Sequence, residues 1–177
     1  GEPPRWAPGS GAKVFAYLQS GHPDHELVLK ALAELGCRTV CYLPEVAAGR
    51  PPPVASPLIH YCSTHADLAL TLPGCSLCLR HTAGATVAHA LLLGVPTLLL
   101  PTQTEQFLLA RRIGRIGMGI NAAERVRPLD YAALIASMLG ETSYLRAARA
   151  FAARYSGFTA ARHTSDLVDE FERLLNA

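Results

Sequence analysis

The residues best suited to chemistry form the segment His81-Thr82-Ala83-Gly84-Ala85-Thr86. It follows an apolar run and precedes a helical pattern, so it is expected to join a strand to a helix. A helix N-terminus presents free backbone N–H groups and the positive end of the helix dipole, which suits a phosphate or diphosphate. Small residues at 83–85 let the backbone approach such a ligand, and His81 and Thr86 add donors. Neither common phosphate fingerprint is present, so taken alone the segment fits an ordinary turn equally well.

The cysteines do not indicate a metal centre. Cys75, Cys78 and His81, with His60, Cys62 and His65 upstream, have spacings that a zinc site could use. However, Cys75 and Cys78 are expected to face opposite sides of a strand, and buried free cysteines are common. There are five cysteines, an odd number, and no leader pattern opens the chain. We therefore predict reduced thiols, a cytoplasmic location and no bound metal.

Two further groups of polar residues lie near the expected strand ends. His22 and His25 are predicted to be a solvated loop pair, with His22 retained as a candidate ligand contact because of its position. Arg80 directly precedes His81 and could help to neutralise a diphosphate. A surface position or an ion pair is at least as good an interpretation of Arg80.

Strands that alternate with helices must position these residues. The apolar runs predict six strands, at 14–18, 38–43, 58–62, 76–80, 96–100 and 118–121. Helical patterns lie between them, with Asp24 able to cap the first, and three more helices follow residue 128. This alternation predicts an α/β fold, a doubly wound parallel sheet of about six strands that is Rossmann-like and has a helical tail. Ligands of such folds bind beyond the carboxyl ends of the strands.

Composition limits the class of protein. The 177 residues are 50% hydrophobic and 17% charged, with a net charge of +2. This balance predicts one folded domain and excludes a disordered chain. The absence of a basic block argues against a nucleic-acid partner, and no apolar run has the ~20 residues of a membrane span. The Pro-rich start without Met predicts a linker remnant over residues 1–12, before a domain over 13–177. The excess of Arg over Lys suggests a GC-rich bacterial genome.

The segment from His81 to Gln106 resembles the donor-binding signature of the GT-B glycosyltransferases, which have two Rossmann-like halves. It is most similar to family 1, the UDP-glucosyltransferase and antibiotic glycosyltransferase family. Members of that family carry His-x-Gly-x-x-Ser/Thr, then Ala-Leu-x-x-Gly-Val-Pro, then Pro-x-x-x-Asp/Glu-Gln. The matching residues here are His81, Thr86, Ala90-Leu91, Gly94-Val95-Pro96, Pro101 and Glu105-Gln106, in step and without a gap. The resemblance covers roughly residues 13–121.

The resemblance implies a role for each matched position. The donor diphosphate would be held by His81 and Thr86, by the amides of Gly84 and Ala85, and by Ser20 nearby. Glu105 and Gln106 would bind the sugar hydroxyls, and their carboxylate and amide groups suit that role. The loop Ser63-Thr64-His65 would pass beside the nucleobase, and His89 would also contact the nucleoside.

This chain departs from the family pattern at several positions. The Gly two residues after the motif histidine is Ala83 here, and the ribose-binding Glu eight residues after it is His89. The base-stacking aromatic residue falls near Ser63, and Tyr61 is the nearest replacement. The donor nucleotide therefore stays open between UDP and dTDP.

The resemblance implies a nucleotide-sugar-binding C-terminal half of an inverting glycosyltransferase that needs no metal or other cofactor. Its catalytic base and its acceptor site would lie on an N-terminal domain, so this chain alone is predicted to be inactive. Three alternatives stay open: a separate donor-binding subunit with an acceptor partner, half of a sugar-nucleotide epimerase, and a dinucleotide-binding module. The missing glycine fingerprint argues against the last.

Overall fold

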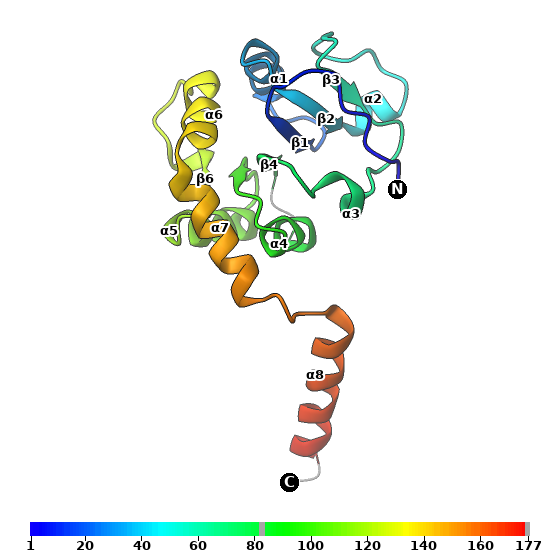
Figure 1. Ribbon diagram of the computed structural model, residues 1–177, viewed down its shortest axis with the longest axis vertical. Helices are drawn as coiled ribbons and strands as arrows, with labels where there is room; N and C mark the ends of the chain where they lie inside the picture. Colours follow the sequence, from blue (N-terminus) through cyan, green and yellow to red (C-terminus); the bar gives the residue numbers. More distant parts are fainter. Residues whose placement is uncertain (82–83, 176–177) are drawn as a thin grey trace.

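An open sheet of six parallel strands organises the chain in the computed structural model, which describes residues 1–81 and 84–175 (Figure 1). The strand order is β3-β2-β1-β4-β5-β6. The strands are β1 (Lys13–Tyr17), β2 (Arg38–Tyr42), β3 (Ile59–Tyr61), β4 (Leu77–Arg80), β5 (Thr97–Leu99) and β6 (Gly119–Asn121). The helices are α1 (His25–Glu34), α2 (Pro44–Ala47), α3 (Leu68–Thr71), α4 (Gly84–Leu92), α5 (Thr104–Arg115), α6 (Tyr131–Gly140), α7 (Thr142–Arg154) and α8 (Ala160–Leu175), with a 3₁₀ turn η1 (Ala122–Glu124).

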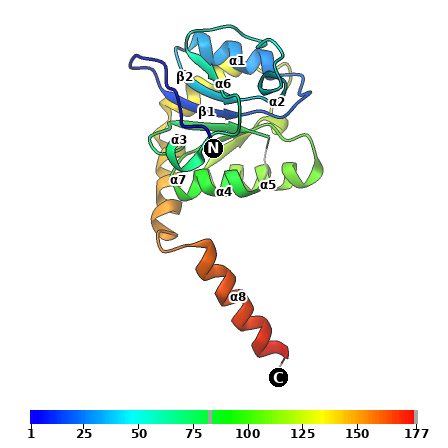
Figure 2. The ribbon, with the colours of Figure 1, turned by 90° about the vertical axis from the view of Figure 1, so that its right-hand side faces the viewer.

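Helices cover both faces of the sheet, as continuously apolar strands require. Helices α1 and α6 lie over one face, and α3, α4, α5 and α7 lie over the other (Figure 2). The first face packs around Val14, Leu29 and Ile135, whereas the second packs around Phe15, Leu72 and Leu99. The predicted α/β doubly wound parallel sheet is therefore confirmed, and every predicted strand lies within about one residue of its observed bounds.

Two local predictions were wrong or incomplete. Helix α2 was not predicted, because Pro44 at its first position was not interpreted as a helix start. Cys75 and Cys78 pack into the same apolar cluster instead of facing opposite sides, because Cys75 precedes β4 and the alternation of a strand does not extend to it. All five cysteines are buried and unpaired, as predicted.

Helix α8 extends away from the rest of the molecule (Figures 1 and 2). None of its residues is buried, and its apolar side chains Leu167, Val168 and Phe171 are about half exposed or more. In the part of the chain that the structure describes, no helix is both long and apolar enough to cross a membrane. The fold that positions the carboxyl ends of the strands is therefore complete without α8.

Deleting residues 158–177 is expected to change the stability of the remaining domain by no more than about 0.5 kcal/mol, because α8 buries nothing against it. That corresponds to about 2 °C in Tm for a chain of this size, measurable by differential scanning calorimetry. A longer deletion from Thr142 is the control. It removes α7, whose Ala147 and Phe151 pack against α4 and α5, and should destabilise strongly. A large loss from the shorter deletion would contradict this description.

Candidate functional site

A cavity of about 270 Å³ opens at the carboxyl ends of β1 and β4. These two strands are neighbours, yet the chain continues from them toward opposite sides of the sheet, which makes this the switch point of the topology. We call this space the carboxyl-edge cavity. It is lined by Tyr17, Leu18, Gln19, Pro44, Arg80, His81 and Gln106. Residues from four different strand ends therefore converge at the place where doubly wound folds bind ligands.

Arg80 is the charged group of this cavity. It is the last residue of β4, only 6% exposed, and paired in register with Tyr17 of β1. Its guanidinium lies 4.6 Å from the centre of the Tyr17 ring, which is a cation–π contact. Its Nε and Nη1 atoms are buried and have no hydrogen-bond partner among residues 1–81 and 84–175. The expectation of a surface position or an ion pair was wrong, since the register places Arg80 between two central strands.

Burial lowers the pKa of Arg80, but a guanidinium keeps its proton in proteins. Buried donors normally find partners, and a buried cation normally finds an anion. Two spare donors on a buried cation, at the edge of a cavity, therefore fit an anionic ligand. The sequence had suggested this role as one of the alternatives for Arg80, from its position directly before His81.

His81 is buried and has both ring nitrogens engaged. Its Nδ1 lies 2.7 Å from the carbonyl oxygen of Leu100, so Nδ1 carries the proton and donates it. Its Nε2 therefore accepts, and it lies 2.9 Å from Nε2 of His25. The ring of His22 is 4.6 Å from that of His81. We call His22, His25 and His81 the histidine cluster.

The interpretation of His22 and His25 as a solvated loop pair was wrong. His25 is the first residue of α1 and is buried, and His22 is partly buried beside it. Burial, assisted by the neighbouring His22, lowers the pKa of both His25 and His81 to about 4. The two imidazoles are neutral at neutral pH.

Acid is expected to destabilise the domain through this cluster. Because the folded-state pKa values of His25 and His81 lie below the value of about 6.5 for an unfolded chain, protonation favours unfolding. The contribution of these two neutral histidines to the free energy of unfolding is fully present above pH 6.5 and is lost as the pH falls toward 4. Urea denaturation at pH 7.5 and pH 5 measures it. His81→Asn should reduce the pH dependence of stability, whereas His89→Gln, which changes an exposed histidine, should leave it as it is in the wild type. Equal stability of the wild type at both pH values would contradict the low pKa values of His25 and His81.

Asp24 connects this region to α6. Its carboxylate accepts hydrogen bonds from the Tyr131 hydroxyl at 2.6 Å and from Arg127 Nη1 at 2.7 Å. Burial alone would raise the pKa of Asp24, but these hydrogen bonds hold it below its usual value. The sequence predicted a helix cap here. Asp24 does stand at the cap position, but its side chain makes no capping hydrogen bond and bridges α1 and α6 instead.

The predicted sugar-binding pair is divided by the structure. Gln106 of α5 is buried and lines the carboxyl-edge cavity, and its Oε1 accepts hydrogen bonds from the amide and hydroxyl of Thr102. Glu105, its neighbour on the first turn of α5, is exposed. The two side chains therefore differ in environment, with Gln106 fixed in the wall and Glu105 open to solvent.

The predicted nucleoside loop after β3 is exposed and is held by the start of the chain. The Glu2 carboxylate accepts hydrogen bonds from the Ser63 amide and hydroxyl and from the Thr64 amide. Burial would raise the pKa of Glu2, but these hydrogen bonds and His60 lower it to about 2. The next residue, His65, lies in an aromatic group with the ends of β1 and β2.

That aromatic group consists of Tyr17, Tyr42 and His65. The ring of His65 is stacked on Tyr17 with planes 5° apart, and its Nδ1 lies 3.2 Å from the Tyr17 hydroxyl. Tyr42 lies 4.4 Å from His65 between ring centres. Tyr61, by contrast, donates its hydroxyl to Val54 and packs in the core, away from this group. The aromatic residues beside the predicted nucleoside loop are thus Tyr17 and Tyr42, which sequence reasoning did not identify.

The remaining predicted residues do not line the carboxyl-edge cavity. Ser20 is exposed and hydrogen-bonds to Glu45, in a separate hollow next to α2. His89 is exposed in the last turn of α4. Gly84 and Ala85 open α4 and are exposed, and Thr86 is partly buried. Thr82 and Ala83, which the motif includes, lie outside the described residues.

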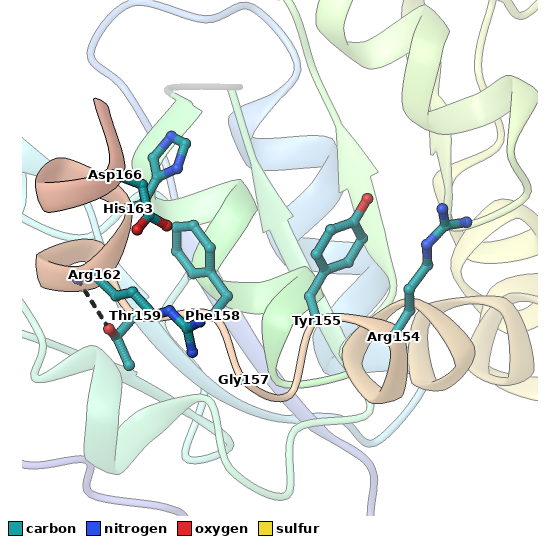
Figure 3. Close-up of a pocket in the computed structure, with 8 residues that line it drawn as sticks. All are labelled: Arg154, Tyr155, Gly157, Phe158, Thr159, Arg162, His163 and Asp166. Carbon is teal, nitrogen blue, oxygen red and sulfur yellow. Dashed lines mark hydrogen bonds between the residues drawn. The ribbon is translucent and has the colours of Figure 1, made fainter. Parts of the chain in front are cut away.

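Another hollow, of about 330 Å³, lies far from the carboxyl edge. Figure 3 shows that its lining side chains come from the end of α7, the connecting turn and the first turns of α8. The rings of Tyr155 and Phe158 line it, and the Arg162 amide donates to the Thr159 hydroxyl across the turn. No residue of the predicted site contributes to it.

Comparisons with known proteins agree with the fold. No family model and no curated protein matches the chain. Several solved glycosyltransferase structures do: a glycotransferase of kitacinnamycin (TM-score 0.74, 18% identity, 96% of this chain), and spinosyn rhamnosyltransferase SpnG complexed with thymidine diphosphate (0.69, 24%, 92%). SsfS6 of Streptomyces sp. SF2575, also complexed with thymidine diphosphate, is a third (0.65, 20%, 92%).

The chain spans 45%, 46% and 42% of the lengths of these three structures, respectively. Sequence identities of 18–24%, together with these TM-scores, establish a shared fold. The six-stranded parallel sheet and its covering helices match one Rossmann-like half of such an enzyme. The chain therefore has the fold of one half of a GT-B glycosyltransferase, as its resemblance to family 1 implied.

Proposed function

We propose that this chain is the donor-binding, C-terminal half of a glycosyltransferase, and that it binds a UDP- or dTDP-linked sugar in the carboxyl-edge cavity. One observation carries the proposal: Arg80 is a buried cation at the switch point of the sheet, and two of its donors have no partner in the part of the chain that the structure describes. A diphosphate supplies the negative charge and the acceptor oxygens that such a group lacks. The thymidine diphosphate bound to relatives of the same fold is compatible with this ligand class.

The surrounding residues suit the other parts of a nucleotide sugar. The N-terminus of α4 follows His81 and offers backbone N–H groups from Gly84 and Ala85 to the diphosphate. Glu105 is exposed on the first turn of α5, next to Gln106 in the chain, and its carboxylate suits sugar hydroxyls. On the other side, the exposed ring of His65 extends an aromatic group on which a base can stack.

His81 can contribute a hydrogen bond to the diphosphate only after it gains a proton. In the free protein Nδ1 donates to Leu100 and Nε2 is an acceptor facing His25. The charge of a bound diphosphate favours the protonated imidazolium, which would donate from both nitrogens. Arg80 is thus the permanent cation of the site, and His81 is a conditional one.

The proposed reaction is an inverting transfer that uses no metal ion. A base on a separate N-terminal domain would take the proton of an acceptor hydroxyl, and the oxygen would attack the anomeric carbon. The bond from that carbon to the diphosphate oxygen would break, and the nucleoside diphosphate would leave with its electron pair. This chain would stabilise the leaving charge through Arg80 and the α4 N-terminus. Alone, it would bind the donor and transfer nothing.

A titration with UDP, dTDP, GDP and NAD⁺, followed by thermal shift and by calorimetry, tests the proposal. One of the first two nucleotides should raise Tm, and His81→Ala should abolish the shift. His163→Ala is the matched control, because His163 is an exposed histidine on α8 outside the cavity, and it should bind normally. Stabilisation by NAD⁺ alone, or by none of the four, would overturn the proposed function.

A further inference from the structure

The histidine cluster brings three imidazoles to one point. One ring nitrogen from each of His22, His25 and His81 lies within 4.8 Å of the others. The Nε2 atoms of His25 and His81 are 2.9 Å apart. Zinc ligands at about 2.0–2.1 Å in tetrahedral geometry are about 3.3 Å apart, so these two atoms need to separate by a few tenths of an ångström. The proton that His25 Nε2 donates to His81 must also move to Nδ1 of His25, which frees the Nε2 lone pair.

The hydrogen bond between His81 and Leu100 already orients one of the three imidazoles for metal binding. The Leu100 carbonyl accepts the Nδ1 proton of His81 at 2.7 Å, which leaves the Nε2 lone pair directed at the cluster. A carbonyl on the second ring nitrogen is the usual support for a metal-binding histidine. His25 is fixed as the first residue of α1, and β1 and β4 bring its helix and His81 together.

The third ligand, His22, is the one whose side chain must rearrange to bind the metal. His22 lies in the loop between β1 and α1 and is partly buried. Its Nδ1 accepts a hydrogen bond of 3.1 Å from the Asp24 amide, which it gives up or reorganises on binding. The flanking charges are mixed, since Asp24 and Glu45 act on His25 while Arg80 acts on His81. Affinity would therefore come from the imidazoles themselves.

We propose that His22, His25 and His81 form a transition-metal site that binds Zn²⁺ through one nitrogen of each residue, with water in the fourth position. Three histidines and an open position form a common zinc set, and imidazole also suits Co²⁺ and Ni²⁺. This site goes beyond the proposed donor binding and belongs to the donor-free chain, because zinc on Nε2 of His81 excludes the protonated imidazolium that would bind the diphosphate. It is therefore tested without a nucleotide.

The experiment uses the whole chain without a polyhistidine tag. Calorimetry with ZnCl₂ should give one site per chain. CoCl₂ should produce the visible absorption of tetrahedral cobalt, and ZnCl₂ should displace it. His22→Ala should weaken zinc binding by more than the 10–100-fold that loss of a supporting partner typically costs. Because His22 lies in a loop, this variant should fold, and its Tm without metal checks that it does.

Two controls keep the assignment specific. His89→Ala removes an exposed histidine, and His60→Ala disrupts a second set of candidate ligands formed by Glu2, His60 and Cys62. Both should bind zinc as the wild type does. Wild-type affinity in His22→Ala, loss of binding in His60→Ala, or the absence of tetrahedral cobalt absorption would each overturn the site.

Discussion

Replacing Asp24 with alanine is expected to lower the free energy of unfolding by about 2–4 kcal/mol, because it removes a buried hydrogen bond to a charged group and a partly exposed ion pair. The carboxylate is 6% exposed and receives the Tyr131 hydroxyl and Arg127. Its removal leaves the Tyr131 hydroxyl buried without a partner, and it disconnects α1 from α6. Urea denaturation at pH 7.5 measures the loss.

Three variants resolve this effect into its parts. Tyr131→Phe removes one hydrogen bond to a charged group and should cost about 1.5–3 kcal/mol. Arg127→Ala should cost about 1 kcal/mol or less, because the Arg127 side chain is 56% exposed. Asp130→Ala removes a capping hydrogen bond to the Ala133 amide and should cost about 1 kcal/mol. If Asp24→Ala cost no more than Asp130→Ala, the bridge between the helices would not be a major source of stability.

Arg80→Met is expected to separate stability from ligand binding. Methionine fills similar space without a buried charge, so the free protein should be as stable as the wild type or more stable. Binding of the nucleoside diphosphate should weaken by about 100-fold, because hydrogen bonds to a charged group contribute about 1.5–3 kcal/mol each. Calorimetry gives the affinity, and thermal unfolding without nucleotide gives the stability.

The controls for Arg80 distinguish charge from geometry. Arg80→Lys keeps the charge but not the planar arrangement of donors, and should bind with intermediate affinity. Arg115→Met removes an exposed arginine at the end of α5 and should change neither quantity. Strong destabilisation by Arg80→Met with unchanged nucleotide affinity would make Arg80 a structural residue held by Tyr17.

The sequence predicted the fold well because the pattern that specifies it is local. Runs such as 14–18 and 98–100 are apolar throughout, as expected for a strand covered on both faces. The positions of His81 after a strand and of Gln106 near the start of a helix could also be predicted, because the residues that define each turn are neighbours in the chain.

The missed features depend on contacts between distant segments. Arg80 looks like a surface residue until the register pairs it with Tyr17 between two central strands. His25 becomes a partner of His81 only because β1 and β4 are neighbours, although 56 residues separate the two histidines. Likewise, the partner of Asp24 is 107 residues away, so local capping rules described its position but not its bond.

Binding of a nucleoside diphosphate at the carboxyl ends of β1 and β4 can be located residue by residue. The measurement follows the backbone amide resonances of ¹⁵N-labelled protein during titration with dTDP and UDP. We expect shifts confined to the residues around Tyr17–Gln19, the segment from Arg80 to Thr86, and Thr102–Gln106, and we expect these shifts to be lost in Arg80→Met. Shifts centred instead on the hollow between α7 and α8, or no shifts with either nucleotide, would contradict it.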